Sequence, residues 1–307
     1  MSQIKKNEIL IIYNSVEFFE KIIQQKGFNI THLYKNENFS TRIIKKICNK
    51  CNINDYFLFG KWIKNIKTYK IIIIFAPIND QTLQYIKSKN PNLRIIYWFW
   101  NPAYRIGRPT PIHYDLSEIW TFDKDNSVQY KMCFNNTFYF NEIKPTPENK
   151  LKKYDVVFVG RNKHRNTTLL QIKNQFDQHQ LKSLIHIVPN RNEENPNNIK
   201  ELSYQEYIDL ISNSKAILDI MPPAQNGLTL RAMESLFLEK KLITDNLHIK
   251  KEAFYNKNNI FIIGEDNMIN LKSFLNTPYE KIDPKIKMNY EFDQWILRII
   301  NNKKEKV

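Results

Sequence analysis

Short runs of β-branched and aromatic residues alternate with helix-period patterns along most of the chain. This alternation is typical of βα units arranged around parallel sheets. In the first half we predict strands at 9–13, 29–34, 70–75, 94–100, 118–122 and 138–140, with helices at 16–25 and 80–88. In the second half we predict strands at 155–159, 183–188, 216–220, 241–244 and 259–263, with helices at 167–176, 204–211 and 228–238. The fold class is therefore α/β. Asn79 or Asp80 is expected to cap the helix at 80–88.

The domain boundary is predicted in the segment 141–153, which has two prolines, many charges and no periodicity. A chain of 307 residues suits two domains of roughly 150 residues each. We expect an N-terminal Rossmann-like domain over 1–145, a C-terminal one over 146–285, and a terminal segment over 286–307. A helix near 290–300 gives that segment an apolar stripe of Phe292, Trp295, Ile296, Ile299 and Ile300. The stripe must be buried, and the N-terminal domain is one surface that could receive it.

The composition indicates a packed globular protein, because 42% of the residues are hydrophobic and 13% aromatic. The longest apolar runs, 71–77 and 95–100, are far shorter than the roughly 20 residues that span a bilayer. The N-terminus has no secretory signal pattern, so we expect a cytoplasmic protein. Three cysteines agree with a reducing compartment, and Cys48 and Cys51 are expected to pack on a helix face rather than to bind metal.

A net charge of +15 suggests phosphate-bearing partners such as nucleotides, anionic lipid or nucleic acid. The stretch from Arg42 to Lys70 holds eight basic residues against one acid, Asp55, with apolar residues between them. This pattern predicts attachment to an anionic membrane surface, with an ordinary solvated helix and loop as the alternative. A basic nucleic-acid-binding protein is a second class, although no helix-turn-helix, zinc finger or RNP-type motif accompanies the charge.

Glycine is scarce, with six in the whole chain, so each one needs a local reason. Gly160 ends a predicted strand and precedes Arg161, Lys163, His164 and Arg165 before a helix. A strand, a glycine turn and a helix N-terminus together favour binding of an anion. No standard phosphate-binding fingerprint occurs, so an ordinary βα turn is the alternative.

A second candidate segment runs from Gln225 through Gly227 into the 228–238 helix. On that helix, Glu234 lies at the edge of the buried face and Arg231 further round. A carboxylate at the edge of a core needs partners, and sugar hydroxyls or a cation would serve. The alternative is a surface pair between Arg231 and Glu234 at i,i+3 spacing.

The run Gly227-Leu-Thr-Leu-Arg231-Ala-Met-Glu234-Ser-Leu, followed by Lys241-Leu-Ile-Thr-Asp245, resembles the donor-site helix and next strand of group 1 type GT-B glycosyltransferases. The resemblance implies two Rossmann-like domains facing each other across a cleft, a nucleotide-sugar donor and no metal or other cofactor. By the same resemblance Glu234 would hold ribose hydroxyls and Arg231 the diphosphate. The family's upstream glutamate is replaced by Gly227, so retention of stereochemistry stays open. The implied donor-binding residues are Gly160, Arg161, Lys163, Arg165, Asn190, Gln225, Gly227, Leu228, Thr229, Arg231 and Glu234.

The first half resembles lipopolysaccharide and capsule glycosyltransferases more faintly, with Trp100 and Asn101 expected to line the cleft. The implied acceptor is a hydroxyl of a surface glycan that is linked to lipid. If transfer inverts the sugar, a base must take the acceptor's proton, and Asp123 is preferred over Asp125 and His113.

Asp123-Lys124-Asp125 also matches the D-x-D motif with which GT-A enzymes bind a metal ion. The alternative is that the two aspartates cap the helix that follows. A glycosyltransferase-like fold that only binds a glycan is a further alternative.

Overall fold

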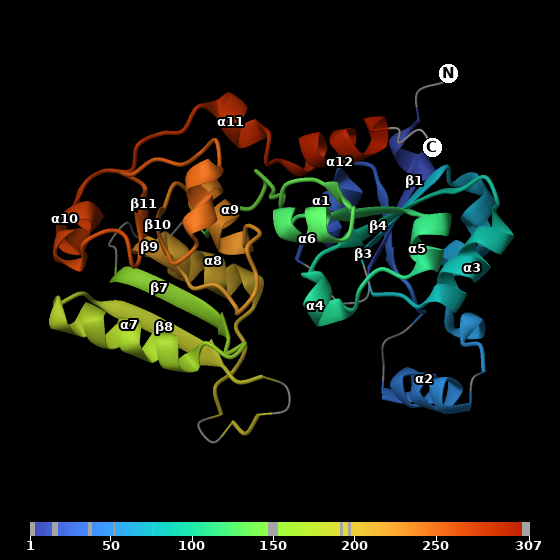
Figure 1. Ribbon diagram of the computed structural model, residues 1–307, viewed down its shortest axis with the longest axis horizontal. Coiled ribbons are helices and arrows are strands. Elements are labelled where there is room, and N and C mark those ends of the chain that lie inside the picture. Colours follow the sequence, from blue (N-terminus) through green and yellow to red (C-terminus); the bar gives the residue numbers. More distant parts are fainter. Residues whose placement is uncertain are drawn as a thin grey trace. The chain divides into compact units, whose positions relative to one another are not determined.

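The computed structural model describes residues 4–13, 18–35, 39–51, 53–75, 77–146, 153–190, 193–195 and 198–302 (Figure 1). The chain divides into two compact units after Asn135. Each unit is an α/β fold built on one parallel sheet, as the alternating pattern predicted.

The first unit has a six-stranded parallel sheet in the order β2-β1-β3-β4-β5-β6. Its strands are β1 (Ile9–Tyr13), β2 (Asn29–His32), β3 (Ile71–Phe75), β4 (Arg94–Phe99), β5 (Glu118–Thr121) and β6 (Cys133–Phe134). Its α-helices are α1 (Glu20–Gln25), α2 (Phe39–Cys51), α3 (Asp80–Lys89), α4 (Ala103–Ile106), α5 (Pro111–Leu116) and α6 (Lys124–Gln129). Three 3-10 helices complete it: η1 (Lys6–Glu8), η2 (Tyr56–Leu58) and η3 (Lys61–Thr68).

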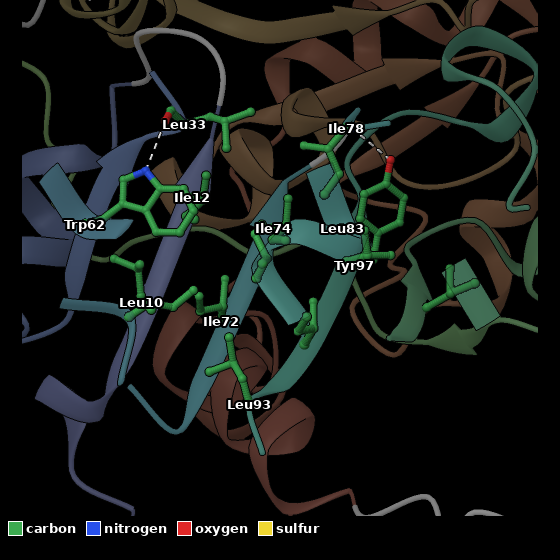
Figure 2. Packing of buried hydrophobic residues seen from close by; sticks show 14 of the residues in the cluster. Leu10, Ile12, Leu33, Trp62, Ile72, Ile74, Ile78, Leu83, Leu93 and Tyr97 are labelled. Atoms are coloured by element: carbon green, nitrogen blue, oxygen red, sulfur yellow. Dashed lines mark hydrogen bonds between the residues drawn. The ribbon is translucent and has the colours of Figure 1, made fainter. Parts of the chain in front are cut away.

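The central strands of this sheet are buried along their whole length, which explains their unbroken apolar sequences. Figure 2 shows part of the core, in which the Trp62 indole N–H donates to the Leu33 carbonyl at 3.0 Å. In the same cluster, the backbone N–H of Ile78 donates to the Tyr97 hydroxyl at 3.2 Å. This bond ties the chain that leaves β3 to the neighbouring strand β4.

The second unit has a five-stranded parallel sheet in the order β11-β10-β9-β7-β8. Its strands are β7 (Tyr154–Arg161), β8 (Ser183–Val188), β9 (Ser214–Asp219), β10 (Lys241–Thr244) and β11 (Ile260–Ile262). Its helices are α7 (Asn166–Gln178), α8 (Tyr204–Ser212), α9 (Leu230–Leu238), η4 (Leu247–Lys251), η5 (Met268–Asn270), α10 (Leu271–Asn276), α11 (Pro284–Met288) and α12 (Phe292–Asn301). The strand order reverses between β7 and β9, and ligands of such sheets bind at the carboxyl ends of the strands at this point.

The division of the chain falls ten residues before the predicted boundary at 145/146 because the segment after Asn135 packs inside the second unit. The Thr137 hydroxyl donates to the Leu228 carbonyl at 2.9 Å, and the Phe138 ring lies 4.4 Å from Trp295. In the predicted linker 141–153, residues 147–152 lie outside the described residues.

One prediction about a short element is wrong, and one short element was not predicted. Residues 138–140 form no strand, since Tyr139 makes only an isolated bridge with Glu291. The short strand β6 was not predicted. The terminal stripe is confirmed at four of its five residues: Phe292, Trp295, Ile296 and Ile299 are buried, and Ile300 is half-buried. Helix α12 lies in the second unit beside Phe138.

Candidate functional site

The turn between β7 and α7 is tight and strained. Lys163 and His164 have φ angles of 46° and 62°, a left-handed conformation that costs about 1–2 kcal/mol for each such residue. The Asn162 side-chain oxygen accepts from the backbone N–H groups of Arg165 and Asn166 at 3.2 and 3.0 Å. These bonds hold the turn and satisfy two N–H groups at the start of α7. Strain of this kind persists where the surrounding structure holds it in place, often at functional sites.

Arg231, from the first turn of α9, reaches this turn directly. Its Nη2 donates to the Val159 carbonyl at 2.7 Å. A Cβ atom at position 160 would lie 2.4 Å from Arg231 Nη2 and 3.3 Å from Arg165 Nη2. Gly160 therefore leaves room for the close approach of two guanidinium groups, which a larger residue would displace. The two candidate segments singled out in the second half of the sequence meet at one place, beside the strand-order reversal of the sheet.

The guanidinium groups of Arg165 and Arg231 both pack against the ring of Phe158. The central carbons of Arg165 and Arg231 lie 4.9 and 4.6 Å from the centre of the Phe158 ring. Arg165 is buried and donates to the Ile220 carbonyl. Arg231 is 15% exposed, and its buried Nε has no hydrogen-bond acceptor among the described residues. Both guanidinium groups are therefore held in place by contacts within the second unit.

Asp219, the last residue of β9, links the start of α9 to the sheet. Its Oδ2 accepts from the Thr229 hydroxyl at 2.7 Å, and its Oδ1 lies 3.6 Å from Arg231 Nη1. Thr229 Oγ1 also accepts from the Ala232 N–H at 3.3 Å and so caps α9. Neither Asp219 nor Phe158 was predicted as a site residue. For Asp219, the sequence signal was a carboxylate at the end of a buried strand.

Three other predicted donor residues gather on the β8 side of the turn. Arg161 donates to the Pro189 carbonyl at 2.9 Å and pairs with Glu201. The Lys163 N–H donates to Asn190 Oδ1 at 3.1 Å. These contacts join the β7 turn to the loop after β8.

The remaining predicted residues lie in the chain that enters α9. Gln225 closes a turn by donating its N–H to the Pro222 carbonyl at 3.2 Å. Gly227 precedes Leu228, which is buried and accepts a hydrogen bond from Thr137 through its carbonyl. This segment therefore follows β9 and runs along the same carboxyl edge as Gly160.

Glu234 is enclosed by tyrosines. Its carboxylate, 1% exposed, accepts from the hydroxyls of Tyr207 at 2.6 Å and Tyr204 at 2.9 Å. The Tyr204 and Tyr139 hydroxyls are 2.6 Å apart and extend the network. Burial raises the pKa of Glu234, although the tyrosine hydrogen bonds oppose this. The partners of this carboxylate are thus tyrosine hydroxyls, and the alternative of a surface pair with Arg231 does not apply.

In the first unit, the two carboxylates of the D-x-D pattern lie in different surroundings. Asp123 is 1% exposed and caps α6 by accepting from the Asn126 N–H at 3.0 Å. Asp125 is exposed on the helix itself. Among the residues that the structure describes, no three His, Cys, Asp or Glu side chains gather in a way that would hold a metal ion.

His113, the third candidate base, belongs to the cap of α5. Its Nδ1 accepts from the Thr110 N–H at 3.1 Å, and its Nε2 is shut off from solvent. Burial lowers the pKa of His113, which favours the neutral ring. Trp100, expected to line a cleft with Asn101, packs against Phe19 and Phe75 at centroid distances of 6.0 and 5.5 Å.

Helix α2 turns its apolar side chains to solvent. Ile43, Ile44 and Ile47 are 41, 37 and 53% exposed. Lys46 and Lys50 are exposed on the same helix, whereas the acid Asp55 is buried and bonded to the Tyr34 hydroxyl. We call the exposed isoleucines and lysines of α2, the helix labelled in Figure 1, together with Ile53 and Phe57, the α2 surface. The Arg42 side chain lies outside the described residues.

Cys48 and Cys51 lie on α2, but only Cys48 is buried, so the expectation that both thiols pack holds for one of them. Within the described ranges, none of the helices has the length and apolar character needed to cross a bilayer.

No protein-family model matches the sequence, and no curated protein matches it. Among solved structures, TarM matches at a TM-score of 0.50 and 12% identity over 80% of this chain and 56% of its own. An α1,3-fucosyltransferase with GDP matches at 0.47 and 11% identity, over 99% of this chain and 95% of its own. MurG of Acinetobacter baumannii matches at 0.36 and 8% identity, over 86% and 88%.

The chain spans little more than half the length of TarM. At such low identity the likeness shows the fold alone. The fold is that of the GT-B glycosyltransferases, two Rossmann-like units each with a parallel sheet. The single-sheet GT-A alternative, which the D-x-D pattern had raised, is therefore wrong.

Proposed function

We propose that this protein transfers a sugar from a nucleotide-sugar donor to a hydroxyl group of a surface glycan. The observation that carries the proposal is the meeting of Arg231 with the turn at Gly160, at the strand-order reversal of the second sheet. A ligand with neighbouring negative charges, such as a diphosphate, matches the two guanidinium groups held there by Phe158.

The same groups suit the chemistry of a leaving diphosphate. As the bond between the anomeric carbon and the diphosphate breaks, negative charge grows on the phosphate oxygens. Fixed donors in a partly buried site stabilise that charge without reorganising. Arg231 and Arg165 would supply this stabilisation, with Arg161 and Lys163 at the outer side of the turn. In this proposal no metal ion or other cofactor takes part.

The proposed acceptor is a lipid-linked glycan, such as lipopolysaccharide core or capsule, at the cytoplasmic face of the membrane. The α2 surface supports this, because its exposed isoleucines and lysines match the apolar and anionic layers of a membrane surface. Clusters of exposed apolar side chains mark surfaces that bind a partner or a membrane, and three isoleucines are exposed on this one helix.

A thermal-stability screen of the purified protein against UDP-, GDP-, ADP- and CMP-linked sugars tests the donor assignment. We expect one nucleotide class to raise the melting temperature, and calorimetry to give the same affinity with and without EDTA. Stabilisation by none of them would reject the enzyme assignment, and strict metal dependence would reject the role given to the arginines. Nucleotide binding without turnover would favour a glycan-binding protein.

Co-sedimentation with vesicles of phosphatidylglycerol and phosphatidylcholine tests the membrane assignment. We expect charge reversal of Lys45, Lys46, Lys64 and Lys67 to glutamate to reduce binding by at least tenfold. A control with the same change in net charge reverses four exposed lysines of the second unit, Lys257, Lys272, Lys281 and Lys285. Equal binding by both variants would reject the role of the basic stretch 42–70, which contains α2 and η3, and preferential binding of RNA or DNA would favour the nucleic-acid class.

A further inference from the structure

The first unit contains a cavity of about 600 Å³ at the carboxyl edge of its sheet. Ile78, which follows β3, and Phe99, the last residue of β4, form part of its wall. Ile106, the last residue of α4, and Thr110, in the loop before α5, also line it. A volume of this size falls within the range of about 300–1,000 Å³ that holds small ligands. The Ile78–Tyr97 hydrogen bond seen in Figure 2 fixes one side of this cavity.

A carboxylate held from one side lines the cavity. Asp80 is the first residue of α3, after the capping residue Asn79. The Thr110 hydroxyl donates to Asp80 Oδ1 at 2.7 Å, and His113 Nδ1 lies 3.3 Å from the same oxygen. The Asp80 side chain is nevertheless 33% exposed. It is therefore oriented by a neighbour and still open to a ligand.

The other candidate bases of this unit are not both held by a neighbour and open to a ligand in the cavity. Asp123 is 1% exposed, and its Oδ1 accepts two hydrogen bonds from Asn126. His113 has its Nδ1 engaged by Thr110 and its Nε2 closed to solvent. Asp125 is exposed but does not line the cavity. A base must reach the proton that it removes, and Asp80 meets this condition best.

The lining of the cavity suits a sugar ring. Ile78, Phe99 and Ile106 offer apolar contacts for the C–H faces of a ring, whereas Gln81 and Arg108 offer donors for its hydroxyl groups. Cys48 of α2 and Ile53 of the α2 surface also line the cavity. The cavity is therefore continuous with the surface that we assign to the membrane. A glycan whose lipid anchor lies in that membrane could reach it.

We infer that this cavity binds the acceptor glycan and that Asp80 is the catalytic base, with Thr110 as its positioning residue. The inference rests on the proposed function. In the step, the Asp80 carboxylate takes the proton of the acceptor hydroxyl while the acceptor oxygen bonds to the anomeric carbon. The bond from that carbon to the diphosphate breaks, and its electron pair leaves with the nucleoside diphosphate. The product glycoside is inverted at the anomeric carbon, and Asp80 later releases the proton to water.

Two measurements on the full chain test the inference. First, hydrogen exchange of the wild type is followed with octyl glucoside and octyl galactoside as acceptor probes. We expect one of them to slow exchange at residues 78–81 and 106–113. Second, transfer to that glycoside is measured for Asp80→Asn. Loss of a general base costs about 10²–10⁴-fold in rate, so we expect kcat to fall at least 100-fold. Donor affinity should stay within twofold of the wild type.

Asp115→Asn is the matched control, because Asp115 is an exposed carboxylate on α5 that does not line the cavity. It should keep wild-type kcat. If Asp80→Asn keeps kcat within threefold of the wild type, or if the glycosides protect neither segment, the inference is overturned. Failure of the wild type to bind any nucleotide sugar would instead reject the proposed function, and the exchange measurement would still judge the cavity.

Discussion

The two parallel sheets of this protein present opposite chemistry at their carboxyl edges. In the second unit, Arg165 and Arg231 lie close to Gly160, and both side chains are largely buried and hydrogen-bonded to backbone carbonyls. In the first unit, the edge is hollowed into a cavity, and the carboxylate of Asp80 is one third exposed. One edge suits an anion and the other a neutral hydroxyl group. The same architecture thus suits both partners of the transfer reaction that we propose, through the side chains that follow its strands.

Gly160→Ala should give the largest effect on the cationic edge. The new Cβ would lie 2.4 Å from Arg231 Nη2, so the guanidinium group must leave the Val159 carbonyl. We expect nucleotide-sugar affinity to fall by about 100-fold, since a charge-assisted bidentate contact is worth about 1.5–3 kcal/mol or more. Calorimetry measures this loss.

Gly264→Ala is the control for that substitution. Gly264 has a φ of 90° and no atom within 4 Å of an added Cβ. It should cost about 1 kcal/mol of stability through backbone strain and leave nucleotide affinity unchanged. Equal loss of affinity in both variants would remove the role of the Gly160 turn.

Thr110→Val should weaken the first unit's edge more mildly. Without its hydroxyl, Asp80 loses a hydrogen bond and α5 loses its cap, which costs about 1 kcal/mol. We expect kcat for transfer to fall about tenfold, with KM for the donor unchanged. Thr110→Ser retains the hydroxyl and should restore the wild-type rate. If the serine variant were as slow as the valine variant, the hydroxyl would not be what positions Asp80.

Thr229→Ala should destabilise the second unit by about 1–2 kcal/mol, because Thr229 both caps α9 and donates to Asp219. Since Arg231 lies in the first turn of that helix, donor affinity should fall by a further threefold to tenfold. Urea unfolding and calorimetry separate the two effects. Thr68→Ala, at an exposed position of η3, should change neither. An unchanged donor affinity in Thr229→Ala would show that the cap does not position Arg231.

Glu234→Gln should give the smallest effect on binding. The carboxylate is enclosed by Tyr204 and Tyr207, so we expect nucleotide affinity to stay within threefold. A tenfold loss of nucleotide affinity would instead support the contact between Glu234 and the ribose that the family resemblance implies. Calorimetry decides between the two outcomes.

The same variant should change the pH dependence of stability. Burial raises the folded-state pKa of Glu234 above its unfolded value. The wild type should therefore be most stable relative to the variant at low pH, and lose that advantage as pH rises through the folded-state pKa. Urea unfolding at pH 5, 6.5 and 8 measures this, with the exposed Glu194→Gln as control. A difference that is constant with pH would contradict the raised pKa.

The strands of both sheets were predictable where they are buried on both faces, because unbroken apolar runs such as Ile71–Phe75 leave few other choices. The aromatic run at 138–140 misled for a related reason. Its rings are buried, but against α12, which lies about 150 residues further along the chain. A local hydrophobic pattern indicates that residues are buried, but it does not show which element they pack against.

The two candidate segments that meet in the second unit could be singled out in the sequence, because Gly160 and Gly227 each stand out in a chain with few glycines. The cavity that we assign to the acceptor was not predictable. Asp80 was taken only as a possible helix cap, and the Thr110 hydroxyl that orients it is 30 residues away in the sequence. The enclosure of Glu234 by Tyr204 and Tyr207 likewise depends on the packing of α8 against α9, which periodicity does not describe.

Calorimetric titration of Arg231→Met with the nucleotide sugar that stabilises the wild type tests the central claim most directly. Methionine retains much of the side-chain volume while removing every guanidinium donor. Arg298→Met is the control, because Arg298 also donates to a backbone carbonyl in the second unit. The account predicts that affinity falls at least 100-fold in Arg231→Met and stays at the wild-type value in Arg298→Met. Undiminished binding by folded Arg231→Met would contradict it.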